Sequence, residues 1–533
     1  MIFIPVGLIF IPILSGVIIY LFKHRYVNYL SIVAQLLVTI LVIVYYVTFK
    51  ESYSDTYIVF GLWDERIGIS LYNDALSLSF VMLSVFIWWM VLLYTLQTKE
   101  EDYNFLFFLL FLEGVFLGLL QSNDLFNMFV FLELTTLLVT ILIAFTKTGE
   151  SFRAALYYLL LNTSGVLAFL LGIILIYNSF GTINVQIVGS MMSSVYDGQI
   201  LIKFAFVLML AGISVKTALF PVFTWLPRAH GVAHSAISAL LSGLIVKGGI
   251  YMFLRITTMY EGASFAYHDF FFVIGGLTAL IGVVFALSQK DIKQVLAYHT
   301  VSQVGIIMMG ISNINQEIAY GGLLHVFNHA FFKSLLFLGA GIIVAQYGTK
   351  KIHDLRGVFK TMPFVSVFMI VGMLSITGAP FFNGFISKSV IKYGIEGNIR
   401  YWILYAVNIG TATSFLKLSQ IFFGQKKQVG EKQIIVHYVP LMTLSFVCII
   451  FGLMYIPISD GFFGIDLTYV KILKLSSFVD YGVTLLIGYM IYVFVVKKDY
   501  IFIKRLRMFN LSFDKANYLF IIYIVVMTLY FIS

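Results

Sequence analysis

Residues 211–249, AGISVKTALFPVFTWLPRAHGVAHSAISALLSGLIVKGG, decide the fold. This stretch places two lysines, Lys216 and Lys247, among apolar residues, where a charged ammonium group is costly to bury. Pro221 follows Lys216 by five residues. Because proline removes one backbone hydrogen bond and clashes with the carbonyl four residues earlier, a helix that carries Lys216 should break near Pro221. Broken membrane helices with a charge beside the break commonly form ion sites.

The composition of the whole chain is that of an integral membrane protein. Of its 533 residues, 60% are hydrophobic and 11% are charged, and the mean hydropathy is +0.97. Soluble domains carry about 25% charged residues. The net charge of +9 therefore indicates basic loops on one side of a membrane, and we expect no nucleic-acid partner. The single cysteine, Cys448, allows no disulfide within the chain.

Apolar segments of about 20 residues, long enough to cross a bilayer, recur along the whole chain. We therefore expect an all-α polytopic membrane protein. The sixteen predicted spans are 2–22, 28–48, 75–97, 104–121, 124–145, 154–178, 201–225, 235–258, 268–288, 293–311, 317–346, 363–391, 401–423, 436–457, 478–496 and 516–532. The last two are the least closely tied to the working core.

The charges of the predicted loops indicate an orientation. Lysine and arginine concentrate in the odd-numbered loops, for example in 350–360 and 426–432, whereas several even-numbered loops are acidic. The positive-inside rule places the basic loops in the cytoplasm. With sixteen spans, both ends of the chain then face outward.

Three acidic residues in or beside the spans are candidates for function. Glu113 and Glu133 lie within successive spans, and Asp124 stands where the span of Glu133 begins. A carboxylate inside the membrane is expensive unless it is paired or protonated. Each residue also has a structural interpretation, because Glu113 can serve helix packing and Asp124 can cap its helix.

A second group of ionisable residues follows in the C-terminal half. His325, His329 and Lys333 are spaced four residues apart and therefore share one helix face. Lys388 comes directly after an interruption that contains Pro380. The His-x-x-x-His spacing also suits a metal, but no third ligand is evident and Lys333 would repel a cation, so we expect no metal.

Any one of these groups alone can be a structural ion pair or a hydrogen-bonded core residue. At least six of them within spans indicate proton transfer, because a bundle held together by packing needs none of them. Burial lowers the pKa of a lysine and raises that of a carboxyl group, and histidine titrates near neutral pH without any shift. If Glu133 and Lys216 pair, each stabilises the charge of the other, so transfer requires that they separate.

The two interrupted helices suggest an internal repeat. Lys216 precedes its proline, whereas Lys388 follows its proline, and the two helices are five spans apart. They therefore cross in opposite directions, as expected for inverted five-helix repeats. The corresponding division is 1–103 for the first three helices, 104–258 and 259–424 for the two repeats, and 425–533 for the C-terminal helices.

Five stretches resemble the antiporter-like subunit family shared by respiratory complex I, Mrp-type cation/proton antiporters and membrane-bound hydrogenases. They are NDLFNMFVFLEL (123–134), SVKTALFPVFTWLPRAHGVAHSAISALLSGLIVKGGIYMFLR (214–255), DIKQVLAYHTVSQVG (291–305), HVFNHAFFKSLLFLGAG (325–341) and DLRGVFKTMPF…GAPFFNGFISK (354–388). The resemblance implies fourteen core helices, or sixteen helices with the two at the C-terminus, arranged as two inverted repeats with two half-channels.

The resemblance also implies roles for individual residues. Glu133 matches the fifth-helix glutamate of the family, Lys216 the lysine paired with it, and Lys247 the central lysine of the eighth helix. The histidine–lysine relay and the basic residue facing the exit are matched by His325, His329, Lys333 and Lys388. Candidate accessory residues are Glu113, Asp124, His230, His234 and His299.

Within the family, the medium-sized Mrp component, usually called the D subunit, fits the length and the motifs best. The resemblance therefore implies a subunit of a multisubunit Na⁺/H⁺ antiporter that translocates protons, or sodium and protons, in a bacterial or archaeal cell membrane. Other membrane subunits are the expected partners, and no cofactor is expected. The alternatives are a proton-pumping subunit of a complex I-related or hydrogenase complex whose redox chemistry lies in other chains, a secondary solute transporter, and a scaffold subunit.

Overall fold

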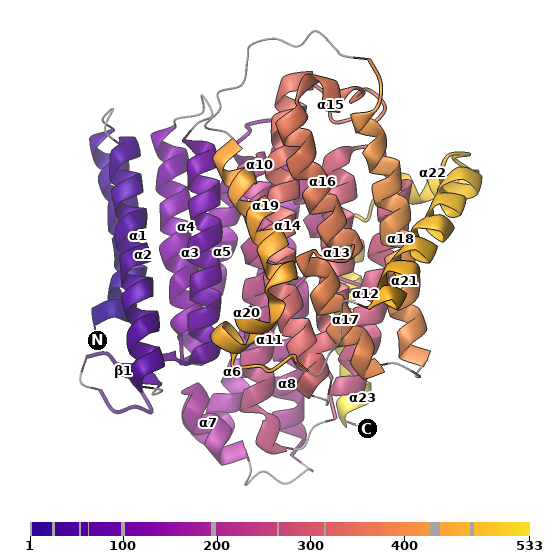
Figure 1. The fold of residues 1–533 in the computed structure, drawn as a ribbon. Coiled ribbons are helices and arrows are strands. Elements are labelled where there is room, and N and C mark those ends of the chain that lie inside the picture. The colour runs from indigo at the N-terminus through magenta and orange to yellow at the C-terminus, as the bar shows by residue number, and fades with distance from the viewer. Residues whose placement is uncertain are drawn as a thin grey trace. The chain divides into compact units, whose positions relative to one another are not determined.

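The structure is a computed structural model of the chain (Figure 1). It describes residues 3–23, 27–52, 55–61, 63–96, 102–192, 199–263, 266–313, 316–395, 397, 399–425, 438–468 and 474–532. The basic residues predicted in the loop 426–432 lie outside the described residues. The chain divides into two compact units. Unit 1 comprises Met1–Thr217, Ile245–Ala266 and Ser512–Ser533, and unit 2 comprises Ala218–Leu244 and Tyr267–Leu511.

Unit 1 is built from helices and one short hairpin. Its elements are α1 (Phe3–Phe22), α2 (Val27–Ser52), β1 (Thr56–Val59), β2 (Ser70–Asn73), α3 (Ala75–Thr95), α4 (Tyr103–Gln121), α5 (Leu125–Ala144), α6 (Gly149–Phe180), α7 (Val185–Met192), α8 (Ile200–Lys216), α11 (Val246–Met259), the 3₁₀ turn η2 (Glu261–Ala263) and α23 (Phe513–Ile532). The strands β1 and β2 pair antiparallel, with Thr56 opposite Asn73.

Unit 2 is helical throughout its described part. Its elements are α9 (Trp225–Val232), α10 (Ser235–Leu240), α12 (His268–Ser288), α13 (Ile292–Ile311), α14 (Gln316–Tyr347), α15 (Val358–Thr361), α16 (Pro363–Thr377), α17 (Asn383–Ile395), α18 (Ile399–Leu418), the 3₁₀ turn η3 (Ser419–Phe422), α19 (Tyr438–Leu453), α20 (Tyr455–Phe463), α21 (Leu475–Ile491), the π-helical turn η5 (Tyr492–Val496) and α22 (Ile501–Arg507). A second π-helical turn, η1 (Leu241–Ile245), joins α10 to α11.

The predicted all-α membrane class is confirmed. Each of the sixteen predicted segments coincides with a helix or with a helix that is interrupted. Among the described residues, twelve helices are long and apolar enough to cross a membrane, or thirteen if α19 and α20, which meet at a bend of 93°, form one broken span. The hairpin and the short helix α7 were not predicted, because each is too short to show a clear hydrophobic period.

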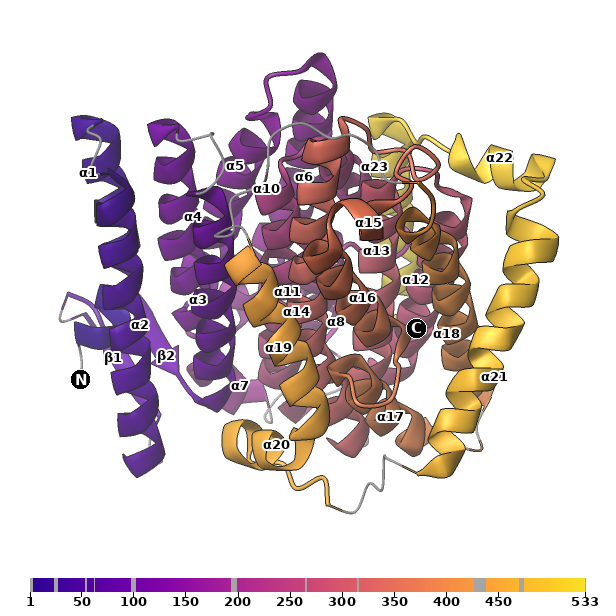
Figure 2. The ribbon, with the colours of Figure 1, turned by 45° about the horizontal axis from the view of Figure 1, so that its top comes forward.

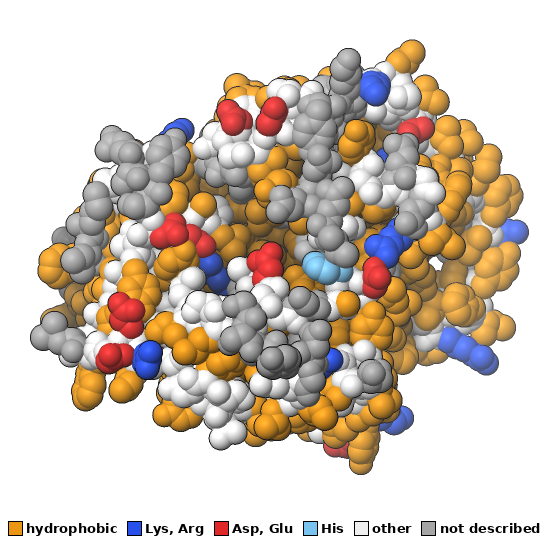
Figure 3. All heavy atoms as spheres, turned by 90° about the horizontal axis from the view of Figure 1, so that it is seen from below, with side chains coloured by type: hydrophobic (Ala, Val, Ile, Leu, Met, Phe, Trp, Pro, Cys, Tyr) orange, Lys and Arg blue, Asp and Glu red, His pale blue; other side chains and the backbone are white. Residues whose placement is uncertain are grey.

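The surface agrees with this class. Along the helix flanks, large apolar side chains remain exposed, such as Leu167, Leu171 and Ile174 on α6, each more than half exposed. Viewed along the helices from below, the surface shows acidic and basic side chains among hydrophobic and other ones (Figure 3). Apolar flanks and charged ends are what a bilayer requires of a helical protein.

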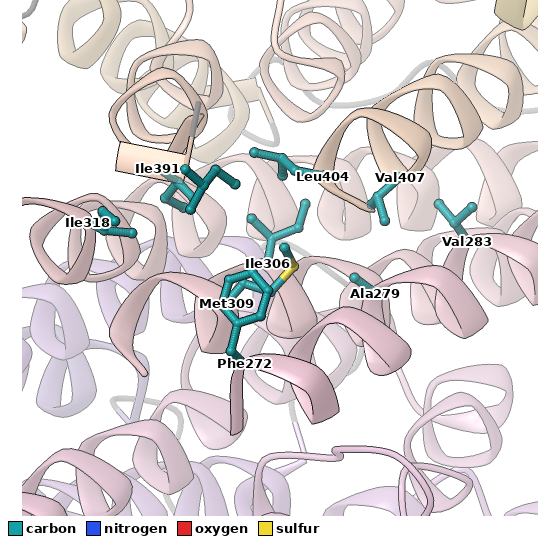
Figure 4. Packing of buried hydrophobic residues seen from close by; sticks show 10 residues of the cluster. Phe272, Ala279, Val283, Ile306, Met309, Ile318, Ile391, Leu404 and Val407 are labelled. Carbon is teal, nitrogen blue, oxygen red and sulfur yellow. The ribbon is translucent and has the colours of Figure 1, made fainter. Parts of the chain in front are cut away.

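The interior of unit 2 contains a compact apolar cluster. Phe272 and Ala279 of α12 and Ile306 and Met309 of α13 meet Ile391 of α17 there (Figure 4). Other members come from α14 and α18, and all of the buried members are at most 3% exposed. This cluster fixes α17, the helix that carries Lys388, against the α12–α13 pair.

The same helix pattern occurs once in each unit. The second helix of the pattern is α5 in unit 1 and α13 in unit 2, which start at 125 and 292. The third helix is α6 or α14, which start at 149 and 316, so both pairs of starts are 167 residues apart. The helices α6 and α14 each contain 32 residues. A glycine with positive φ follows each third helix, Gly181 at +67° and Gly348 at +65°. The pattern supports an internal repeat, whereas the repeat bounds 104–258 and 259–424 stay a prediction.

Backbone hydrogen bonds repeat at the same spacing. In each unit, the residues around the start of the second helix (α5 or α13) form backbone hydrogen bonds with the loop after the third helix (α6 or α14). Each of the two segments contributes one amide donor. The donor–acceptor pairs are Leu125–Ile183 (3.0 Å) and Val185–Asn123 (2.9 Å) in unit 1, and Ile292–Lys350 (2.9 Å) and Ile352–Lys290 (2.9 Å) in unit 2. An aspartate caps each second helix at the centre of this pairing, Asp124 for α5 and Asp291 for α13.

The helix α22 is attached to the end of α12 by charged groups. The Arg507 guanidinium donates to Ser288 O (2.7 Å) and to Asp499, which also accepts from Lys290 (2.8 Å). The hydrogen bond from Arg507 holds the pKa of the Asp499 carboxyl at about 2, below its ordinary value of 3.8. Because a lowered pKa contributes stability above the ordinary value and loses it only as the pH falls toward 2, this attachment is insensitive to pH near neutrality.

Close helix packing in unit 1 depends on glycine at one crossing. A Cβ added at Gly212 of α8 would lie 2.3 Å from the carbonyl oxygen of Gly165 on α6. That oxygen belongs to the backbone, so the two helices would have to move apart.

We predict that Gly212→Ala lowers the stability of the protein by about 1–3 kcal/mol, the usual cost of overpacking. The thermal unfolding midpoint in detergent measures this change. Gly482→Ala is the matched control, because Gly482 is also helical and a Cβ there meets no atom within 4 Å. The control should be neutral or slightly stabilising, since alanine favours helix. Equal midpoints for the two variants would contradict the close-packing argument.

Candidate functional site

Lys216 lies at the last position of α8, and its ammonium group reaches α5. The Nζ atom donates to Leu132 O (3.3 Å) and to the Thr136 hydroxyl, and the residue is only 5% exposed. The predicted helix break is confirmed: α8 ends here, Ala218 has a positive φ of 56°, and the next helix begins at Trp225. A positive charge at this end also complements the helix dipole.

Glu133 lies on α5 between the two residues that bind Lys216. The Thr163 hydroxyl of α6 donates to Glu133 Oε1 (2.9 Å). Among the described residues, no hydrogen-bond donor meets Glu133 Oε2, and no ion pair within 4.0 Å joins Glu133 to Lys216. The carboxylate nevertheless acts electrostatically on the lysine. The two charges are therefore neighbours that do not touch.

Lys247 is the second residue of α11 and is 1% exposed. It follows the π-helical turn η1, and such turns are frequent at functional sites. A Cβ added at Gly249 would lie 3.0 Å from the Thr217 nitrogen and 3.1 Å from the Lys216 carbonyl carbon. Glycine at this position therefore lets the helix of Lys247 pack against the end of the helix of Lys216.

The other two acidic candidates of unit 1 have structural partners. The Gln35 amide of α2 donates to Glu113 Oε1 (2.9 Å), and Glu113 is completely buried on α4. Asp124 caps α5, because its side chain accepts from the Asn127 amide (2.7 Å). The capping interpretation of Asp124 is confirmed. Glu113 remains a candidate, since its second oxygen has no hydrogen-bond partner among the described residues.

In unit 2, the predicted stripe of His325, His329 and Lys333 lies on one long helix, α14. His325 contacts Ser387 Oγ of α17 through Nδ1 (2.8 Å) and Gln303 Oε1 of α13 through Nε2 (3.1 Å). The rings of His325 and His329 are 6.4 Å apart between centroids. The stripe therefore joins three helices at a fully buried position.

Lys333 continues the stripe towards α13. Its ammonium donates to Leu296 O and lies 5.4 Å from the centre of the Phe337 ring. His299, also on α13, packs against Phe415 at 4.8 Å, and neither of its ring nitrogens has a hydrogen-bond partner among the described residues. The charges of Lys333, Lys388 and Lys417 all act on this imidazole. His299 therefore lies within the electrostatic reach of three lysines, which its sequence position did not indicate.

Lys388 lies on α17, directly after the break that follows α16. Its Nζ donates to Ile376 O (2.7 Å), a carbonyl in the last turn of α16 that has no helical partner. Gly378 ends α16 with φ of +78°, and a Cβ added at Gly384 would lie 1.9 Å from Ser375 O. Glycines therefore allow the two half-helices to meet closely beside the lysine.

The two remaining histidine candidates lie in the last turn of α9, His230, and at the start of α10, His234. The ring of His230 stacks on Phe337 at 4.5 Å and 10°, and His230 is completely buried. His234 immediately precedes α10 and is half-buried. His230 therefore lies against the same phenylalanine as Lys333.

Comparison with known proteins gives one family for this arrangement. Residues 122–415 match the family model described as NADH:quinone oxidoreductase/Mrp antiporter, transmembrane. The chain belongs to this family. Its identity with the D subunit of the Na⁺/H⁺ antiporter of Alkalihalophilus pseudofirmus is 31% over 461 residues, covering 82% of this chain and 92% of that protein. A putative antiporter subunit, mnhD2, of Staphylococcus aureus is 28% identical over 83% of this chain and 90% of its own length.

Two solved structures share the fold. A chain of the archaeal membrane-bound sulfane sulfur reductase has a TM-score of 0.81 at 24% identity, covering 91% of this chain and all of its own. A chain of the Mrp complex from a Dietzia species has a TM-score of 0.78 at 22% identity, covering 95% and 99%. The family match includes every residue predicted for the translocation path.

Sequence analysis missed two features of the chain, an ion pair in unit 1 and a lysine in unit 2. Arg255 of α11 forms two hydrogen bonds with Asp74, at 2.6 and 2.7 Å, and a third with the Tyr251 hydroxyl (2.8 Å). Lys417 of α18 donates to three carbonyls at 2.8–3.0 Å, two of them in the last turn of α12 and one just after it. The only sequence signal was a basic residue within or at the end of an apolar span.

We predict that Asp74→Asn destabilises the protein, because it leaves Arg255 9% exposed and without its counter-charge. Breaking a fully buried pair costs about 3–5 kcal/mol, and the 21% exposure of Asp74 reduces that figure. Thermal unfolding measures the loss, with exposed Asp466→Asn as control. The double variant Asp74→Asn, Arg255→Met should lose less than the sum of the single variants. A strictly additive result would show that the two side chains do not interact.

Proposed function

We propose that this chain is the ion-translocating membrane subunit of a multisubunit Na⁺/H⁺ antiporter of the Mrp type, located in the cell membrane of a bacterium or archaeon. The likeness to the D subunit of a Na⁺/H⁺ antiporter supports this proposal, because the identity of 31% extends over 92% of that protein's length. The observation that carries the chemistry is the buried lysine Lys216, held next to Glu133 without an ion pair.

In unit 1, Lys216 is the proposed proton carrier. A carboxylate in direct contact would hold the lysine in its charged state, whereas a hydroxyl and a carbonyl stabilise the ammonium without a full opposite charge. A small movement of the Lys216 side chain towards Glu133 then favours binding of a proton by the lysine, and a movement away favours release of that proton. Lys247 is the proposed next carrier, because Gly249 packs its helix against the end of α8.

In unit 2, the proposed path uses the α14 stripe, His299 and Lys388. An imidazole can accept a proton at one ring nitrogen and donate one from the other. Ser387 and Gln303 orient the His325 ring through both ring nitrogens. Lys388 ends the path at the break between α16 and α17, where its ammonium is held by one carbonyl.

The alternatives are less well supported. A subunit of a redox-driven complex remains the second candidate from the sequence, but the likeness to the sulfur reductase chain, at 24% identity, concerns the fold alone. A solute carrier would bind an organic group, whereas the buried polar groups described above are single ionisable side chains spaced along helices.

The proposal is tested on the whole complex purified from its own cells. Mass spectrometry of the co-purifying chains should identify further membrane subunits. After reconstitution into vesicles, an imposed sodium gradient should drive proton movement that a pH-sensitive dye records. Purification as a redox enzyme whose turnover drives proton movement without any sodium dependence would replace the antiporter assignment with the second candidate.

We predict that Lys216→Ala abolishes ion translocation while the complex still assembles, because the carrier is removed and the small side chain leaves the helix end intact. Dye-recorded flux and gel filtration of the complex measure the two outcomes. Lys203→Ala, on the same helix but outside the site, is the matched control and should transport normally. Normal flux in Lys216→Ala would remove Lys216 from the mechanism.

We predict that Glu133→Gln impairs translocation although the side chain keeps its shape and can still accept from Thr163. The neutral amide cannot attract the ammonium of Lys216, so the switching between two positions is lost. Flux measurements and infrared difference spectra, which should lose a carboxylate signal, check this result. Unchanged flux together with an unchanged carboxylate signal would exclude the switching pair.

A further inference from the structure

A pocket of about 350 Å³ lies in unit 2 over Lys388. The end of α16 and one face of α17 line it on one side, α18 on another, and the first turns of α21 on a third. Both ribbon views show α21 running alongside α18 (Figures 1 and 2). The wall of the pocket includes hydroxyl, amide and charged groups, which suits water better than a lipid chain.

Two polar contacts join α21 to the interrupted helix at this pocket. Lys392, one turn beyond Lys388 on α17, donates to Asp480 Oδ2 of α21 at 2.9 Å. The hydroxyls of Tyr481 and Thr377 are 3.0 Å apart, and Thr377 is the last residue of α16. These contacts hold α21 across both half-helices at their break.

The Lys392–Asp480 ion pair is placed where water reaches it. The side chains of Lys392 and Asp480 are 35% and 56% exposed, whereas Lys388 is 5% exposed. Lys392 also lies over the Tyr401 ring of α18, at 5.4 Å from its centre. The pair therefore stands at the mouth of the pocket, and the lysine of the translocation path lies deeper.

The inner wall offers water a place to bind. Asn408 of α18 lines the pocket, and its side-chain oxygen is buried without a hydrogen-bond donor among the described residues. Unsatisfied buried acceptors in polar cavities are usual positions for ordered water. Asn408 and the surface pair thus mark the inner and outer ends of one short polar route.

Helix α21 is poorly suited to be a packing element alone. Only 17% of its spanning window is buried, and residues such as Leu486 are more than half exposed. An aspartate and a tyrosine side by side on such a helix therefore need a reason beyond stability.

We propose that Asp480 and Tyr481 of α21 form a gate over Lys388, closing a water-filled vestibule through which protons pass between the path and the outer solution. The closed state contains the Lys392–Asp480 ion pair and the Thr377–Tyr481 hydrogen bond. In the open state both contacts are broken, and water connects Asn408 with the surface. The role for protons rests on the proposed function, whereas the vestibule and its gate are properties of the pocket itself.

Thiol labelling tests the gate without any transport. In the intact complex carrying Cys448→Ala, Asn408→Cys is exposed to a charged, membrane-impermeant thiol reagent on the side opposite the basic loops. We expect slow labelling that becomes about two- to fivefold faster with Asp480→Asn, the factor that one exposed ion pair can contribute. Lys392→Met should give the same increase, and the two changes together should add nothing further.

Controls separate the gate from general loosening. Leu486→Cys, on the exposed flank of α21, should stay unlabelled, and Asp466→Asn should leave the rate at Asn408→Cys unchanged. Ser389→Cys, which also lines the pocket, is the second reporter if Asn408→Cys does not assemble. Absence of labelling at both reporters in every background would overturn the vestibule, and equal rates with and without Asp480→Asn would overturn the gate.

Flux measurements distinguish failure of this proposal from failure of the proposed function. Asp480→Asn should change the rate of proton movement, whereas Asp466→Asn should not. If Lys216→Ala transports normally but Asp480→Asn speeds labelling, the gate stands and the translocation path is wrong. If Lys216→Ala is inactive and Asp480→Asn changes neither labelling nor flux, the path stands and the gate is wrong.

Discussion

The free-energy cost of placing ammonium groups inside a membrane governs this structure. Backbone carbonyls lower this cost by accepting hydrogen bonds from the ammonium groups. Buried lysines donate to main-chain oxygens, Lys216 to Leu132, Lys333 to Leu296 and Lys388 to Ile376, and the half-buried Lys417 donates to three residues at the end of α12. A carbonyl has two lone pairs and no net charge. It can therefore solvate an ammonium group without fixing its proton, as a carboxylate in contact would do.

This requirement explains why helices end and break where they do. Carbonyls with no helical partner occur in the last turn of a helix, and the ends of α12 and α16 supply them to Lys417 and Lys388. Leu132 and Leu296 lie inside helices, and there a threonine four residues later, Thr136 or Thr300, donates its hydroxyl to the same oxygen. Lys388 and Lys417 thus occupy positions where the backbone has acceptor capacity left, whereas Lys216 and Lys333 share carbonyls that also accept from a threonine hydroxyl.

The sequence predicted the spans but not the partners. Length and hydropathy located all sixteen helical segments, because both are local properties, and Pro221 and Pro380 marked the two breaks. Asp74 and Arg255 are 181 residues apart, and no local pattern connects them. Sequence analysis expected Glu133 and Lys216 to pair, and these residues are neighbours in the structure. The direct hydrogen-bond partners of the lysine, however, are Thr136 and Leu132. Asp480 was overlooked because it stands at the edge of a span, where an acidic residue is unremarkable.

The spacing of 167 residues between equivalent backbone positions separates the scaffold from its chemistry. At this spacing, the position in the second half that is equivalent to Glu133 is Thr300. The positions equivalent to Tyr158 and Asn162 are His325 and His329. The two halves therefore keep the same helix starts and the same capping aspartate, whereas Glu133, His325 and His329 each face a residue of another kind at the matching position. Such a chain can acquire a different affinity for protons in each half without solving the packing problem twice. An asymmetry of that kind, inside a symmetric frame, lets one half bind a proton under conditions in which the other half releases it.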